Sequence, residues 1–258
     1  MNVMIRCAKL ATLWFVVVVL VACAGPQRAE REARDKEAVQ NRVAAGMEYL
    51  HQGQLNEARQ HFSRALERDG SSPVAHNAMA LLYKYEGDLE REEHHYKRAL
   101  RLDKSYTAAR NNYGILLFQR GDFAAAKKEF EIAANDPKYG ARAGAFENLA
   151  RSCMALEQYP EAIRAFQRAL RLGQPEASIL PDLVEAYIQD GQPEYAREYF
   201  EQYLDLQEGK LNTAQALWLG IRVAAYQQNS ALQYEYEQQL QREFSKSAEY
   251  KLWQQWRD

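Results

Sequence analysis

Residues 147–170 read ENLARSCMALEQYPEAIRAFQRAL, and this stretch carries the pattern that organises most of the chain. An aromatic residue, Phe166, is flanked by two small ones, Ala162 and Ala169. Aromatic residues recur in the same register at steps of 34, 34, 36, 34 and 36 residues, and they are Phe62, Tyr96, Phe130, Phe166, Phe200 and Tyr236. Six markers in one register indicate an internal repeat of about 34 residues.

Each repeat also carries a residue that predicts a turn. A glycine lies nine residues before the aromatic residue in four copies, at Gly53, Gly87, Gly121 and Gly191, whereas Glu157 and Gln227 take its place in the other two. Glycine at such a point ends one helix and lets the chain reverse into the next. Small residues such as Ala58 and Ala65 then let the paired helices approach closely. The pattern therefore predicts pairs of antiparallel helices.

A period of 34 residues with these small and aromatic positions resembles the tetratricopeptide repeat family. The resemblance implies an all-α fold, a right-handed superhelix of six helix-turn-helix repeats. We expect the repeats at residues 39–72, 73–106, 107–140, 143–176, 177–210 and 213–246. The sixth copy departs most, because Leu232 and Gln239 stand where small residues are expected, so its second helix should pack more loosely. Residues 247–258, with Trp253 and Trp256, are expected to form a capping helix, and a second binding patch is the alternative.

The first 22 residues have the features of an export signal. Arg6 and Lys9 precede an apolar run over residues 10–22 that is shorter than the roughly 20 residues of a membrane-spanning helix. The run ends in Leu-Val-Ala-Cys, which resembles the lipobox of bacterial lipoproteins. That resemblance implies cleavage before Cys23, a covalent lipid on Cys23 and, because Ala24 rather than Asp follows, an outer-membrane destination. An ordinary export signal with an incidental cysteine is the alternative.

Residues 23–38 link this site to the first repeat and are almost purely polar after Cys23. We expect a lipidated cysteine followed by a charged, partly helical tether, which reaches up to about 50 Å if extended. The lipid anchor would hold the protein on the periplasmic side of the membrane.

Composition and motifs exclude several classes of protein. The 258 residues carry a net charge of -2, so the chain has no basic footprint for nucleic acid. No nucleotide-binding, hydrolase or metalloprotease motif is present, so we expect no enzyme, no small-molecule substrate and no cofactor other than the lipid. His94 and His95 are adjacent and point apart on a helix, so no metal site is expected. Cys153 is expected to be a small buried filler.

The family resemblance places function on a concave groove formed by the first helix of each repeat. The predicted groove positions in the first three repeats are mainly apolar, with several asparagines: Val43, Met47, Leu50, Asn77, Leu81, Tyr85, Asn111, Asn112, Ile115 and Phe118. In repeats 4 and 5 they become more polar: Glu147, Arg151, Met154, Glu185 and Ile188. Exposed apolar patches of this kind mark partner sites, and the asparagine amides suit a bound peptide backbone. The alternative is that a neighbouring helix or the tether covers them.

The lipobox and the six repeats together resemble the type IV pilus biogenesis/stability lipoprotein family. Residues 111–117, NNYGILL, followed by Gly-Asp-Phe at 121–123, and residues 147–170 are similar to the central repeats of that family. The resemblance implies a pilotin, an outer-membrane lipoprotein whose partner is a secretin subunit and which promotes secretin localisation and multimerisation. The alternative is a lipoprotein scaffold that recruits peptidoglycan hydrolases or other envelope enzymes.

Overall fold

The computed structural model describes residues 28–257, so the signal segment and Cys23 lie outside the described residues. The described chain is helical, without a strand, and it forms two compact units, one ending at Ala109 and one beginning at Arg110. Among residues 28–257, no helix combines the length and the apolarity that a bilayer crossing requires. The expected fold class, all-α tetratricopeptide repeats, is confirmed.

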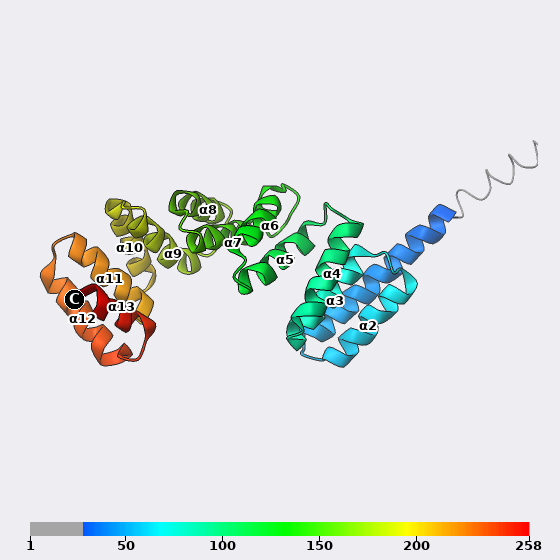
Figure 1. The fold of residues 1–258 in the computed structure, drawn as a ribbon, viewed down its shortest axis with the longest axis horizontal. Coiled ribbons are helices and arrows are strands. Elements are labelled where there is room, and N and C mark those ends of the chain that lie inside the picture. Colours follow the sequence, from blue (N-terminus) through cyan, green and yellow to red (C-terminus); the bar gives the residue numbers. More distant parts are fainter. Residues whose placement is uncertain (1–27, 258) are drawn as a thin grey trace, which may run out of the picture. The chain divides into compact units, whose positions relative to one another are not determined.

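The first unit contains a helix over residues 28–51, followed by α2, α3 and α4 (Figure 1). The bounds of the labelled helices are Leu55–Arg68, Pro73–Glu86 and Leu89–Leu102. α3 packs against both α2 and α4. The core of this unit includes Phe62 and Leu82, both fully buried.

The second unit begins within α5, whose bounds are Thr107–Gln119, and continues to α13 (Figure 1). The remaining helices are α6 (Phe123–Asn135), α7 (Arg142–Ala155), α8 (Tyr159–Arg171), α9 (Glu176–Gln189), α10 (Pro193–Leu206), α11 (Ala214–Tyr226), α12 (Ser230–Phe244) and α13 (Ala248–Arg257). Consecutive helices from α6 to α12 pack side by side, which makes a continuous stack of antiparallel pairs.

The predicted turn residues hold the left-handed backbone conformation. Gly87, between α3 and α4, has a φ of 73°, and Glu157 adopts a φ of 57° at the position where the glycine is missing. In the sixth repeat the expectation for Gln227 was wrong, because Gln228 carries the positive φ of 56°. Asn229 then accepts a hydrogen bond from the Leu232 backbone N–H as the N-cap of α12, so the turn is shifted by one residue.

In three repeats the aromatic marker packs against a glycine located 16 positions earlier, on the first helix of the same repeat. A Cβ placed on Gly114 would lie 2.7 Å from Phe130 Cε1, and one placed on Gly220 would lie 2.9 Å from Tyr236 Cδ2. The same contact joins Gly46 to Phe62. The absence of a side chain on the first helix therefore allows the aromatic ring of the second helix to approach the backbone.

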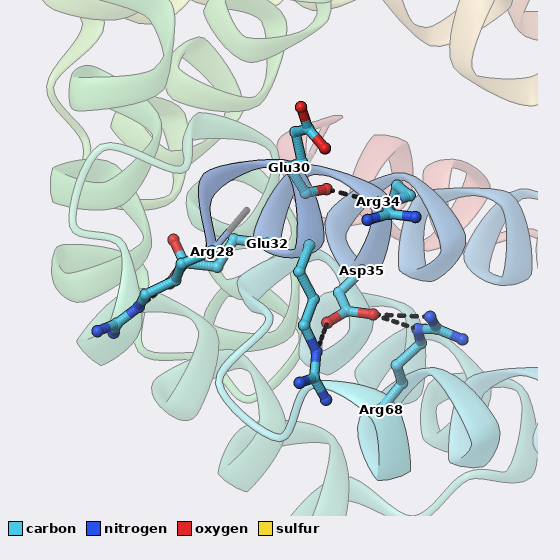
Figure 2. A network of polar contacts seen from close by, with 7 residues as sticks. Arg28, Glu30, Glu32, Arg34, Asp35 and Arg68 are labelled. Carbon is cyan, nitrogen blue, oxygen red and sulfur yellow. Dashed lines mark hydrogen bonds and ion pairs between the residues drawn. The ribbon is translucent and has the colours of Figure 1, made fainter. Parts of the chain in front are cut away.

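The predicted tether is largely a helix. Residues 28–38 continue into the first repeat without a break, so residue 38 is not a structural boundary. Arg28 pairs with Glu32 at 2.8 Å, and Asp35 accepts two hydrogen bonds from Arg68 of α2, at 2.9 and 2.6 Å (Figure 2). As a helix these 11 residues rise about 16 Å, less than half of their extended length.

The C-terminal end of the second unit has weaker packing. α12 buries only Leu240 completely, in line with the loose sixth repeat expected from the sequence. α13 packs against α11 and α12 and buries Trp253, which is 3% exposed. Leu252 and Trp256 on the same helix remain about half exposed, at 49% and 48%. α13 therefore covers the end of the stack with Trp253 and leaves a second apolar surface free.

Two partly buried histidines of the first unit face each other between α3 and α4. His76 Nδ1 on α3 and His95 Nδ1 on α4 are 3.0 Å apart, and His76 Nε2 lies 3.2 Å from the Gly70 carbonyl oxygen. Burial lowers the pKa of both rings, that of His95 to about 4. The pair is therefore neutral at pH 7 and one ring donates to the other.

Candidate partner-binding groove

Three of the predicted groove residues in the first unit are not accessible. Val43 and Leu50 are 7% and 1% exposed and belong to the hydrophobic core, together with Met79 and Leu82 of α3. Asn77 is buried as well, at 8%. The prediction that these three residues line an open groove is wrong. Val43 and Leu50 pack against α3, the first helix of the next repeat, at positions that sequence spacing alone assigns to the surface.

The other predicted residues of the first unit retain some exposure. Met47 and Leu81 are partly buried against the same core, whereas Tyr85 is 57% exposed at the C-terminal end of α3. Tyr85 is therefore the one predicted groove residue of this unit, within the described chain, that presents a large apolar surface to solvent.

The second unit contains an open groove along its first helices. A hollow of about 280 Å³ between α5 and α7 is lined by Ile115, Phe118, Gln119, Phe130, Asn148 and Arg151. A second hollow of about 570 Å³ extends it to α9 and is lined by Phe118, Arg151, Met154, Ala155, Asp182 and Glu185. The two hollows share Phe118 and Arg151, so they form one continuous groove.

A third hollow, of about 400 Å³, continues this groove toward α11 and α13. Its lining residues are Glu185, Gln189, Trp218, Arg222, Leu252, Gln255 and Trp256. The Trp218 and Trp256 rings meet edge to face, with centroids 5.8 Å apart. This end of the groove is therefore an aromatic pocket with a charged wall.

Ion pairs between successive first helices form the floor of the groove. Arg151 of α7 contacts Glu147 at 2.8 Å and Asp182 of α9 at 3.0 Å. Arg222 of α11 contacts Glu185 of α9 at 2.6 Å and lies over the Trp218 ring. The Arg222 and Glu185 side chains are only 13% and 26% exposed, so this pair is held more firmly than a surface pair.

The asparagine amides lie at the start of the groove. Asn148 of α7 donates a hydrogen bond of 3.4 Å to the Asn111 side-chain oxygen of α5. Both residues are half-buried, as is Asn112. An amide group has two N–H donors and an oxygen acceptor, so Asn111 and Asn148 keep capacity for a peptide backbone beyond this single contact.

Sequence reasoning located part of this groove. Ile115, Phe118, Arg151, Met154 and Glu185 line it as expected, whereas Glu147 is buried beneath it. Three further residues line it through contacts with a neighbouring helix, which sequence spacing does not reveal: Asp182, Trp218 and Arg222. The one signal in the sequence is the tryptophan-rich C-terminus, for which the sequence predicts a cap or a second binding patch.

The sequence is similar to known tetratricopeptide repeats and to a pilus assembly protein. Three stretches, residues 39–72, 77–140 and 143–174, match tetratricopeptide repeat families. The chain is 26% identical over 249 residues to the type IV pilus assembly protein PilF of Pseudomonas aeruginosa, covering 95% of this chain and 98% of PilF.

Among solved structures, this chain is similar to two proteins of type IV pilus biogenesis. The structure of Pseudomonas aeruginosa PilF superposes with a TM-score of 0.73 at 28% identity, covering 85% of this chain and 98% of that one. PilW, described as a widely conserved type IV pilus biogenesis factor, superposes with a TM-score of 0.67 at 26% identity, covering 83% and 97%. YrrB, a tetratricopeptide repeat protein with an unusual peptide-binding site, matches at 22% identity with a TM-score of 0.63, covering 73% and 94%, and shows the fold alone.

Proposed function

The chain belongs to the tetratricopeptide repeat family, and from that premise we propose that it is an outer-membrane pilotin. In this role it binds secretin subunits of the type IV pilus machinery and promotes their localisation and multimerisation in the outer membrane. The observation that carries the proposal is the likeness to PilF, which extends over 95% of this chain and 98% of PilF rather than over a few repeats.

The groove of the second unit supplies a surface for such a partner. Phe118 and Ile115 at one end and Trp218 and Trp256 at the other are separated by the polar floor around Arg151. An amphipathic segment with two apolar anchors fits this arrangement, because apolar side chains fill the end pockets and backbone or polar groups meet the ion pairs. In this proposal the cargo is an unassembled secretin subunit that carries such a segment.

The lipid and the groove have separate roles in this proposal. The acyl chains on Cys23, which lies outside the described residues, direct the complex to the outer membrane, since each buried CH₂ contributes about 0.8 kcal/mol. Residues 28–38 already belong to the first helix of the first unit and pair with α2 through Asp35 and Arg68, so only residues 24–27 separate that helix from the anchor. The groove selects the cargo, and the lipid sets the destination.

Variants in the native strain test the two roles separately. Phe118→Asp with Trp256→Asp places a charge in each end pocket, so we expect loss of heat-resistant secretin multimers and of secretin binding in vitro, with outer-membrane fractionation retained. The matched control, Leu206→Asp with Tyr234→Asp, changes an apolar and an aromatic residue that are 47% and 63% exposed on α10 and α12, away from the groove. Circular dichroism should show equal helicity in both.

The anchor variant should show the opposite behaviour. Cys23→Ser should keep secretin binding in vitro but leave secretin monomers away from the outer membrane. Full secretin affinity in the groove variant would show that the partner docks elsewhere, and normal secretin multimers in a deletion strain would overturn the pilotin role. Capture of peptidoglycan hydrolases in place of secretin would favour the scaffold alternative.

A further inference from the structure

Another hollow in the second unit lies on the opposite side of α7 from the groove. It has a volume of about 450 Å³ and lies between α6, α7 and α8. Its lining residues are Lys127, Glu131, Asn135, Arg142, Phe146, Leu149, Cys153, Glu161, Arg164, Ala165, Arg168 and Arg171, and we call it the basic cleft.

The spacing of residues on α7 separates this cleft from the groove. Phe146, Leu149 and Cys153 share one stripe of the helix, whereas Asn148 and Arg151 line the groove. Leu149 and Arg151 are two residues apart, or about 200° around the helix axis. α7 therefore forms a wall with one binding surface on each side, and a substitution in one hollow leaves the other intact.

The cleft is strongly positive in a chain that is negative as a whole. Five cationic side chains line it against two carboxylates, a local excess of three positive charges, whereas the full chain carries -2. Glu161 is engaged by Arg164 at 3.0 Å. Within residues 28–257, neither Arg168 nor Arg171 has a carboxylate partner, and both are exposed. The rim therefore presents guanidinium groups that are free to pair with an anion from outside.

Two of the guanidinium groups are held in place around an aromatic floor. The Arg142 and Arg168 guanidinium carbons lie 5.8 and 6.0 Å from the centroid of the Phe146 ring. Arg142 also donates a hydrogen bond of 3.0 Å from Nε to the Ala134 carbonyl oxygen near the end of α6, which fixes the direction of its terminal N–H groups. Planar guanidinium groups fixed in this way match carboxylates in two-pronged geometry.

We propose that the basic cleft binds an acidic peptide segment of a partner protein, in which an apolar or aromatic residue lies between glutamates or aspartates. The apolar residue would meet Phe146 and Leu149 on the floor, while the flanking carboxylates pair with Arg168 and Arg171 on the rim. The volume lies within the roughly 300–1,000 Å³ typical of ligand pockets. An anionic membrane surface fits less well, because a flat array of headgroups does not fill a hollow with an aromatic floor.

Fluorescence anisotropy on the full chain in detergent tests this proposal. The probe is a labelled, C-terminally amidated peptide of sequence Glu-Glu-Phe-Glu-Glu, with Gln-Gln-Phe-Gln-Gln and Glu-Glu-Gly-Glu-Glu as comparison peptides. We expect only the first to bind measurably, and its affinity to fall as salt is raised. Arg168→Glu with Arg171→Glu should weaken it at least tenfold. Lys210→Glu with Lys246→Glu makes the same change in net charge at two exposed sites outside the cleft and should leave it unchanged.

Three outcomes would overturn the proposal. The first is that the Arg168/Arg171 variant and its control bind the Glu-Glu-Phe-Glu-Glu peptide with equal affinity. The second is that the protein binds the phenylalanine and glycine peptides with equal affinity. Neither result is compatible with recognition in this cleft. The third is binding of phosphatidylglycerol vesicles, but not of the peptide, in a manner that depends on Arg168 and Arg171, because the cleft would then recognise a membrane. The groove variant Phe118→Asp with Trp256→Asp should bind the peptide normally, so a failure of the pilotin proposal is distinguishable from a failure here.

Discussion

Glycine-to-alanine substitutions at Gly114 and Gly144 probe the packing contact that defines the repeats. Both glycines lie inside helices, α5 and α7, and neither has a positive φ. Alanine favours a helix over glycine by about 0.5–1 kcal/mol, so in open space either substitution stabilises the protein. A Cβ on Gly144 meets no heavy atom within 4 Å, and Gly144→Ala should therefore show this gain.

Gly114 differs because the Phe130 ring occupies the space that a side chain at this position would need. A Cβ there would lie 2.7, 2.9 and 3.0 Å from three ring carbons of Phe130. The Phe130 residue is 1% exposed and packs with Leu117 and Ala126, so the ring cannot move without displacing them. Overpacking of this kind costs about 1–3 kcal/mol. Because the helix-propensity gain is common to both substitutions, Gly114→Ala should be less stable than Gly144→Ala by about 1–3 kcal/mol.

Urea unfolding followed by far-UV circular dichroism measures this difference, with unfolding midpoints compared because repeat stacks depart from two-state behaviour. Phe130→Leu supplies the control, since it removes the ring that clashes. In that background Gly114→Ala should lose most of its penalty, which a double-mutant cycle reports as a positive coupling. Equal stabilisation by Gly114→Ala and Gly144→Ala would refute the ring-on-glycine packing.

Four further outcomes are expected. Ala133→Trp places an indole at a fully buried position and should destabilise the protein by at least about 1–3 kcal/mol in urea unfolding, so an unchanged midpoint would contradict the repeat register. Burial lowers the pKa of His76 and His95, so below pH 6.5 the unfolded chain binds more protons than the folded one. The contribution of the two rings to the free energy of unfolding should be fully present above pH 6.5 and decrease as the pH falls toward 4. His95→Gln should weaken this pH dependence of the urea unfolding midpoint. Arg68→Ala should change global stability by less than about 1 kcal/mol but speed amide hydrogen exchange in residues 28–38, since it removes their link to α2. Cys23→Ser should abolish incorporation of labelled palmitate into the chain, and undiminished labelling would show that no lipid is attached there.

The repeat architecture follows from the sequence because its determinants are local. Phe166 and Ala150 lie 16 residues apart on the two helices of one repeat, and a glycine or alanine stands at the same spacing in every copy but the fifth, which has Val184. Turn glycines such as Gly87 are visible because few other residues adopt a positive φ at low cost. Glu157 and Gln228 hold that conformation without being glycine, so their turns depend on the packed helices on either side, and the position in the sixth repeat was misjudged by one residue.

The functional surfaces depend on contacts between repeats, which have no fixed period. Val43 and Leu50 occupy positions expected on a groove, yet the adjacent helix α3 buries them. Arg222 meets Glu185 from 37 residues away, and the basic cleft collects side chains from three helices. Sequence spacing fixes which face of a helix a residue occupies, since 3.6 residues complete each turn. What covers that face depends on how successive helix pairs stack, and only the tertiary structure decided it for this protein.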